Sequence, residues 1–323
     1  MFLPSHPLPA PLPDRSQGHS QEDWGPRAQR LVTAFLAGRK PSTRRAYARD
    51  LQDFARFTAS PTPEHATALL LAHSPGYANE LVLSYRTHMA EQLHLSPATI
   101  NRRLAALRSV VRLGRLLGLV NWTLETPSLP SQRYRDTRGP GRTVYDSILR
   151  LLEQHSPTNA AACRNLAILR LLHDLGLRAG EVASLRLQDL DLENHRLHII
   201  GKGRTEREPL SLPAPTRQSI ERWLTLRGST PGPLFTNFDR AHKGPGLTTT
   251  SIYRLVRALG ERVGARVRPH GLRHLAITEA LDRTGGNLRA VQKFSRHRDL
   301  RVLLVYDDNR QDLAGEIASM VAG

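Results

Sequence analysis

The sequence lacks long apolar runs and internal repeats and has very little cysteine. Its one cysteine, Cys163, can form neither an internal disulfide nor a multi-cysteine zinc or iron–sulfur site, which fits a reducing cytoplasm. No stretch approaches the ~18 consecutive apolar residues of a membrane-spanning helix, so we expect no membrane partner. Prolines interrupt the first residues and no basic region precedes them, so we expect no signal peptide.

Acidic residues are also scarce relative to basic ones. The chain has 29 Asp and Glu against 46 Lys and Arg, a formal charge of +17. Such an excess favours a polyanionic partner, and nucleic acid is the first candidate. The competing interpretation is that a GC-rich genome raises the arginine content of all its proteins, so motifs must decide between the two.

The length of 323 residues predicts two domains. Composition divides the chain into a disordered N-terminal arm, a helical DNA-binding domain, a basic linker rich in Pro, Gly and Arg, and a second domain, at residues 1–24, 25–125, 126–143 and 144–323. The second domain combines helices with a hairpin, in which Arg196–Ile200 pairs with Glu208–Leu212. The predicted fold class is therefore mainly α with a small antiparallel β-sheet.

Residues 25–125 are predicted to form four helices. The first begins near Pro26, the second has Ser42 as its N-cap, and the third runs near Ala78–Gln92. The fourth has Ser96 as N-cap and Pro97 at its first position, a strong start signal.

Two of these helices carry arginines that are candidates for DNA binding. On the fourth helix no acid interrupts a run of basic residues between Ser96 and Leu117, whereas a solvated helix usually mixes its charges. We therefore expect these helices to contact phosphates. The alternative is a helix packed on the core whose charges only face solvent. The candidates are Arg44, Arg45, Arg103, Arg108 and Arg112.

Four short features of the second domain bear chemistry. They are Arg178 with Glu181, Lys202 between two glycines, His270 with Arg273, and His297 with Tyr306 nine positions later. Each has an ordinary interpretation when taken singly: a salt bridge, a common turn, a pair of helix residues, a packed tyrosine. A zinc site built on His270 and His274 is disfavoured because the glutamate of the zinc-protease motif is missing between them.

Taken together and in this order, the features resemble the phage integrase family, the tyrosine recombinases. The Gly-Leu-Arg-x-x-Glu and His-x-Leu-Arg-His boxes and the step from His297 to Tyr306 carry the resemblance. It covers residues from about Val144 to the end. It implies an α+β catalytic domain, preceded more loosely by an all-α, SAM-like core-binding domain. The implied activity is Xer-like site-specific recombination for integration, excision or dimer resolution.

Tyr306 is the implied nucleophile, which forms a covalent 3′-phosphotyrosine bond with DNA. Arg178 and Arg273 are suited to stabilise charge on the phosphate oxygens, since guanidinium groups bind phosphate through two hydrogen bonds. Glu181 would orient this cluster without touching DNA. The arginines supply the charge neutralisation that metal ions supply elsewhere, so we expect neither a metal nor ATP nor another cofactor.

Proton transfer needs further residues. By the resemblance, His270 is the candidate general base and His297 a hydrogen-bond donor to the phosphate. Lys202 is the candidate general acid for the leaving 5′-oxygen, because a partly desolvated lysine can lose its proton and an arginine cannot.

Double-stranded DNA is the expected partner, and we expect the protein to function in the bacterial cytoplasm, at the nucleoid. Strand exchange implies four copies of the chain on two DNA sites but no stable tetramer in solution, so we expect a monomer when free. A second recombinase or an accessory factor could take part. Two alternatives remain: a type IB topoisomerase, which rejoins the same strand, and a DNA-binding protein without catalysis.

The chain departs from the family pattern at two places. Arg296 stands before His297, where the family commonly has glycine, and a positive φ there would strain Arg296. Asp307 and Asp308 follow the nucleophile, and their charges would repel an incoming phosphate unless they turn away.

Overall fold

The computed structural model describes residues 24–130, 139–156, 158–201, 206–238, 246–304, 306 and 313–322. The chain divides into two compact units, Met1–Gln132 and Arg133–Gly323, each with its own hydrophobic core. Among the described residues, no helix is long and apolar enough to cross a membrane.

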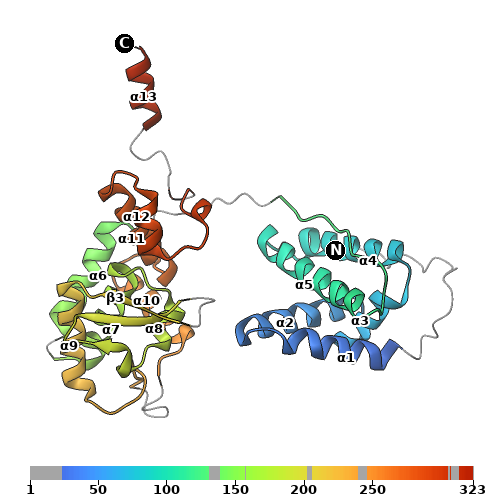
Figure 1. Cartoon of the computed structure of the whole chain (residues 1–323), viewed down its shortest axis with the longest axis horizontal. Helices are drawn as coiled ribbons and strands as arrows, with labels where there is room; N and C mark the ends of the chain where they lie inside the picture. Colours follow the sequence, from blue (N-terminus) through green and yellow to red (C-terminus); the bar gives the residue numbers. More distant parts are fainter. Residues whose placement is uncertain are drawn as a thin grey trace, which may run out of the picture. The chain divides into compact units, whose positions relative to one another are not determined.

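The described secondary-structure elements of the first unit are all helical (Figure 1). Its elements are α1 (Trp24–Ala37), α2 (Pro41–Phe57), α3 (Pro63–Ala72), α4 (Pro75–Thr87), the π-helical turn η2 (His88–Gln92) and α5 (Pro97–Leu116). Ser96 caps α5 by accepting a hydrogen bond from the backbone N–H of Thr99, which confirms the predicted start. Buried side chains from α1 to α5 share one core, which includes Leu31, Phe54 and Tyr85.

Three expectations for this unit were wrong. Trp24, assigned to the arm, begins α1 and is 4% exposed, because its indole joins the core. The N-cap of α2 is Lys40 rather than Ser42, since Pro41 already occupies the first helical turn. The sequence interpretation also missed α3, whose apolar run shows no clear helical period; Thr62 caps it by accepting from His65 N–H.

The second unit surrounds α7 (Ala160–Asp174), which is buried on most of its surface and contacts α6 (Arg142–His155), α9 (Ala214–Arg227) and α11 (Pro269–Arg283). A helix that is apolar on nearly all sides must lie inside the domain. The other helices in the described part of this unit are α8 (Ala179–Ser184), η3 (Leu187–Asp189), α10 (Thr249–Arg262), α12 (Leu288–Ser295), η5 (Leu300–Val302) and α13 (Leu313–Ala322). In Figure 1, α11 and α12 lie next to each other.

The described strands of this unit form a three-stranded antiparallel sheet in the order β1 (Leu190–Asp191), β2 (Arg196–Ile200), β3 (Arg207–Ser211). Leu197 pairs with Leu210 and Ile199 with Glu208, which confirms the predicted hairpin. Leu197 and Ile199 alternate with exposed or half-buried neighbours and face the core. The fold is therefore mainly α with a small antiparallel sheet, as predicted, although β1 had not been anticipated.

The second unit also contains a small separate apolar cluster, formed by α11, α12 and residues that follow α12. Ile277 and Leu281 of α11 pack with Val291 of α12, Leu303 and Tyr306. Because α11 also contacts α7, this cluster attaches Leu303 and Tyr306 to the centre of the domain.

Candidate active site

The N-terminus of α8 positions the first two predicted residues. Gly176, with φ +54, turns the chain after α7, and Arg178 becomes the N-cap of α8. The backbone N–H of Arg178 donates to Glu181 Oε2 at 2.9 Å and its Nη1 donates to Glu181 Oε1 at 2.8 Å. The Arg178 side chain is 30% exposed, whereas that of Glu181 is 5% exposed. Glu181 therefore holds the arginine in place from the protein side.

Arg273 on α11 is the most deeply buried of the predicted residues, with 1% exposure. Its guanidinium donates to the carbonyl oxygens of Gly176 and Ser295, and its Nη2 lies 3.4 Å from His297 Nε2. Burial, together with the charges of Arg178 and Arg296, lowers the pKa of Arg273 to about 9. Its Nε has no hydrogen-bond partner within the described residues. The Arg273 guanidinium is therefore a positive charge held in place at a site where an anion could bind.

Three rings lie in a row beside these arginines. His270 and His274 follow each other by one helical turn of α11, with ring centroids 4.1 Å apart. The His274 ring lies 4.9 Å from that of Tyr306, which is 5% exposed. His270 itself is exposed and borders a cavity of about 570 Å³ that Arg266, Arg268 and Gly139 also line. The sequence interpretation had considered His274 only as a metal ligand.

His297 lies between Arg273 and the tyrosine, with its ring centroid 6.2 Å from that of Tyr306. Burial and the charges of Arg273, Arg178, His270 and Arg296 lower its pKa to about 4. The imidazole is therefore neutral at pH 7. Its Nδ1 is buried and has no hydrogen-bond partner within the described part of the chain.

The structure thus brings together six predicted residues from elements far apart in the chain: Arg178, Glu181, His270, Arg273, His297 and Tyr306. Lys202 lies outside the described residues, as do Asp307 and Asp308. Lys202 belongs to the segment between Ile200, the end of β2, and Arg207, the start of β3.

Arg296 has the positive φ that the sequence comparison raised, at 57° with ψ 34°. Its side chain is nevertheless 4% exposed and forms an ion pair with Glu181 at 3.3 Å. Sequence reasoning treated Arg296 only as a departure from the family pattern. No local signal could have revealed the pair, because its partner lies 115 positions earlier.

Sequence reasoning also missed a buried polar network between α7 and α11. At the end of α7, His173 Nδ1 lies 2.9 Å from Asp174 Oδ1, and its Nε2 lies 3.3 Å from Glu279 Oε2 of α11. The His173 ring stacks on that of Tyr145, with 3.9 Å between the ring centroids. Burial by itself lowers the pKa of His173, but hydrogen bonds and charges from the two carboxylates outweigh it, and the pKa is raised. The network joins α7 to α11.

The DNA-binding candidates of the first unit differ in their surroundings. Arg103 is 13% exposed and forms an ion pair with Asp53 at 2.6 Å. Arg108 donates to Thr126 O at 3.0 Å and to the Ser128 hydroxyl at 3.1 Å. Arg112 is exposed and has no hydrogen-bonding or ionic partner in the described structure.

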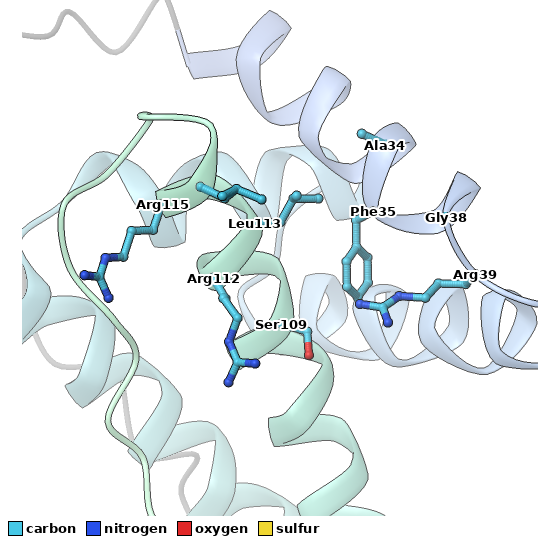
Figure 2. Close-up of a pocket in the computed structure, with 9 residues that line it drawn as sticks. Ala34, Phe35, Gly38, Arg39, Ser109, Arg112, Leu113 and Arg115 are labelled. Atoms are coloured by element: carbon cyan, nitrogen blue, oxygen red, sulfur yellow. The ribbon is translucent and has the colours of Figure 1, made fainter.

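Arg112 lines a cavity of about 780 Å³ on the first unit. Figure 2 shows Arg112 and Arg115 projecting from α5 and Arg39 following the end of α1. The Arg39 guanidinium lies 4.9 Å from the ring centre of Phe35. Arg44 and Arg45, near the start of α2, are both exposed residues of the same unit.

Comparison with known proteins identifies the family. The sequence profile of the phage integrase family matches residues 142–312. A tyrosine recombinase of Synechococcus elongatus is 42% identical over 292 residues, which cover 88% of this chain and 90% of the relative. A tyrosine recombinase XerC of Pelobacter propionicus is 31% identical over 284 residues, covering 87% and 89%.

Solved structures share the fold. XerH recombinase in a post-cleavage complex with its palindromic difH substrate has a TM-score of 0.65 and 18% identity, covering 94% of this chain and 85% of its own. The Tn1549 transposon integrase bound to transposon right-end DNA has a TM-score of 0.61 and 17% identity, covering 92% and 99%. With the matched family profile and the identity of the relatives, these findings establish that the chain belongs to the phage integrase family, the tyrosine recombinases.

Proposed function

We propose that this tyrosine recombinase cleaves DNA by attack of the Tyr306 hydroxyl on a phosphodiester, which leaves a covalent 3′-phosphotyrosine bond and a free 5′-hydroxyl. The observation that carries the proposal is the position of Tyr306, packed on α11 and α12 beside the rings of His274 and His297. A phenol with a pKa near 10 is a poor nucleophile at pH 7 and needs such neighbours.

Arg178 and Arg273 would bind the non-bridging oxygens of the attacked phosphate. Negative charge grows on these oxygens in the transition state, and guanidinium groups already fixed in place stabilise it without reorganising. Arg273 is fixed by Gly176 O and Ser295 O, and Arg178 by Glu181. The proposal needs neither a metal ion nor ATP, because the arginines supply the positive charge and the phosphotyrosine retains the energy of the broken linkage.

The histidines would divide the remaining tasks. His297, whose Nε2 lies 3.4 Å from Arg273 Nη2, is the proposed hydrogen-bond donor to the phosphate. His270 is the proposed base for the tyrosine proton; its exposure leaves its ring accessible to the DNA. Lys202 is the proposed acid for the 5′-oxygen, carried by the segment that joins β2 to β3.

The first unit is proposed to grip double-stranded DNA, with residues 24–125 as core-binding domain, 126–141 as linker and 142–323 as catalytic domain. Arg112 is the best-supported contact, because it is exposed beside Arg39 and Arg115. Arg44 and Arg45 are further contacts. The internal partners of Arg103 and Arg108 indicate that these two act mainly within the protein.

Recombination is proposed to proceed in a tetramer on two DNA sites. Helix α13 presents Met320 and Val321, which are 78% and 82% exposed, and would dock on a neighbouring copy. Deleting residues 312–323 should then abolish synapsis and leave the monomer folded. Undiminished synapsis by the truncated chain would refute this role.

The catalytic proposal is tested with nicked suicide duplexes that carry candidate sites, incubated with the full-length protein in metal chelator and separated on denaturing gels. We expect a DNA-linked band with the wild type and none with Tyr306→Phe. Tyr253→Phe is the matched control, because Tyr253 is 39% exposed on α10, outside the site. A band that persists in Tyr306→Phe, or no band on DNA that the wild type binds, would overturn the proposal. Relaxation of a supercoiled plasmid without strand exchange would indicate a topoisomerase instead.

A further inference from the structure

Arg296 adopts a backbone conformation that disfavours its own residue type. It ends α12 in the left-handed region, with φ 57° and ψ 34°, where its N–H donates to Gln292 O at 2.8 Å. Residues other than glycine pay for this conformation, and they persist in it only where the surroundings compensate. Glycine would fit here without that penalty, so the side chain must contribute something that glycine cannot.

The Arg296 guanidinium supplies that contribution through four contacts. Nη1 donates to Leu175 O at 3.2 Å and Phe294 O at 3.0 Å, while Nη2 donates to Gly176 O at 3.2 Å and lies 3.3 Å from Glu181 Oε2. The first three acceptors are backbone carbonyls at the ends of α7 and α12. A buried guanidinium with this geometry ties the turn that precedes Arg178 to the segment that carries His297.

Two of these acceptors are shared with the proposed catalytic arginines. Glu181 accepts from Arg178 as well as from Arg296, and Gly176 O accepts from Arg273 as well as from Arg296. Removing the Arg296 side chain therefore changes the surroundings of both arginines at once. The side chain itself is 4% exposed and is directed to acceptors inside the protein.

We propose that Arg296 is a positioning residue of the active site, which holds Arg178, Arg273 and His297 in their relative places before the DNA phosphate arrives. The inference rests on the proposed function of these three residues. Arg296 acts through Glu181 and the carbonyl of Gly176, and it does not bind the phosphate. Its left-handed backbone is the cost of placing a guanidinium within reach of these four acceptors.

The roles of backbone and side chain are separated by three substitutions in the full-length protein. Arg296→Gly relieves the backbone and removes every side-chain contact. Arg296→Ala removes the same contacts and keeps the backbone strain. Arg296→Lys retains a charge that can reach Glu181 but lacks the forked donors for the carbonyls. His195→Gly is the matched control, because His195 also has a positive φ of 53° while its side chain is exposed in the turn after β1.

Two quantities are measured for each variant: the single-turnover rate of adduct formation at saturating suicide duplex, and the equilibrium affinity for the same duplex. We expect Arg296→Gly to form adduct about 10- to 100-fold more slowly, the size expected when catalytic groups are misplaced by about an ångström. Arg296→Lys should recover part of the rate, and the affinity should change by less than about twofold because no phosphate contact is lost. His195→Gly should match the wild type in both.

Several outcomes would overturn the inference. One is a wild-type rate in Arg296→Gly, and another is a loss of affinity that parallels the loss of rate, which would mean that Arg296 acts on DNA binding and not on the catalytic step. If Arg296→Gly or Arg296→Ala does not fold, Arg296→Lys decides: a wild-type rate in that folded variant overturns the role of the fork. Failure of the underlying function is distinguishable, because the wild type itself would then form no adduct.

Discussion

Replacing Glu181 by glutamine should destabilise the second unit strongly, although the two side chains have nearly the same shape. The substitution removes the carboxylate charge from between two guanidinium groups. The charges of Glu181 and Arg296, 3.3 Å apart and both nearly buried, attract by about 5 kcal/mol at an effective dielectric constant of about 20. Arg178 adds less, because water screens its partly exposed side chain.

Part of this attraction offsets the cost of burying the ions, so we expect Glu181→Gln to lower the free energy of unfolding by about 3 kcal/mol. That is about two powers of ten in the unfolding equilibrium. The matched control is Glu153→Gln: Glu153 pairs with Arg170 at 2.9 Å but is 45% exposed, and its loss should cost less than about 1 kcal/mol.

The free energy is measured by hydrogen exchange with mass spectrometry in increasing urea. Peptides from α7 report the unfolding of the second unit alone, because this helix runs through its core. Equal losses in Glu181→Gln and Glu153→Gln would refute the reasoning.

The pH dependence provides a second check on the same pair. Burial alone would raise the pKa of Glu181, but the Arg178 N–H and the charges of Arg296 and Arg178 outweigh it, and the pKa is lowered. A lowered pKa stabilises the fold above the unfolded value of about 4.3, and this contribution disappears as the pH falls through the folded pKa. The stability gap between wild type and Glu181→Gln should therefore be largest at neutral pH and shrink in acid. A gap that is independent of pH would contradict the ionic origin.

Three further predictions follow from other parts of the structure. Gly139→Ala should lower the free energy of unfolding by about 2 kcal/mol and slow adduct formation. The φ of Gly139 is +63°, and a Cβ atom there would lie 2.3 Å from Gly271 O in the first turn of α11. Because the pKa of His173 is raised, its imidazolium stabilises the second unit below the unfolded pKa of about 6.5, and this stability is lost as the pH rises through the folded pKa. His173→Asn should therefore remove this pH dependence of the free energy of unfolding, as measured by urea titrations at several pH values. Arg112→Ala should weaken DNA binding and reduce the salt slope of the affinity by about 0.9 without changing stability, whereas Arg103→Ala should mainly lower stability, as anisotropy and melting curves can measure.

Each of these has a result that contradicts it. An unchanged melting temperature in Gly139→Ala would mean that the first turn of α11 yields at little cost. A wild-type pH profile in His173→Asn would assign the pH dependence to another group. If Arg103→Ala lowered DNA affinity more than Arg112→Ala, the ion pair with Asp53 would not keep Arg103 from DNA.

Short-range patterns in the sequence predicted the parts of this protein that depend on neighbouring residues. Ser96 and Pro97 announced the start of α5, because capping and a fixed proline φ act within one turn. The alternation in Arg196–Ile200 predicted β2, because a strand with one face on the core repeats every two residues. The comparison of local motifs also raised a positive φ at Arg296 as a condition for strain, and the structure has it.

Contacts between distant segments escaped the same reasoning. Arg103 and Arg112 look alike on one basic helix, yet Asp53 of α2 pairs with the first and leaves the second exposed. Helix α3 has too little periodicity to be recognised and is stabilised by the core that it joins. The indole of Trp24 likewise extends α1 only because other helices cover it.

The sequence by itself determined which residue types this protein offers for phosphate chemistry, and in which order, because each box of the family is a few residues long and needs only local geometry. Only the tertiary structure decided that Arg296 and Arg178 share Glu181, that Arg273 is buried against the turn after α7, and that Tyr306 packs beside the histidines. The physical reason is that burial, ion pairing and the pKa shifts that follow arise from contacts between segments that lie tens to more than a hundred residues apart. No pattern confined to one segment contains that information.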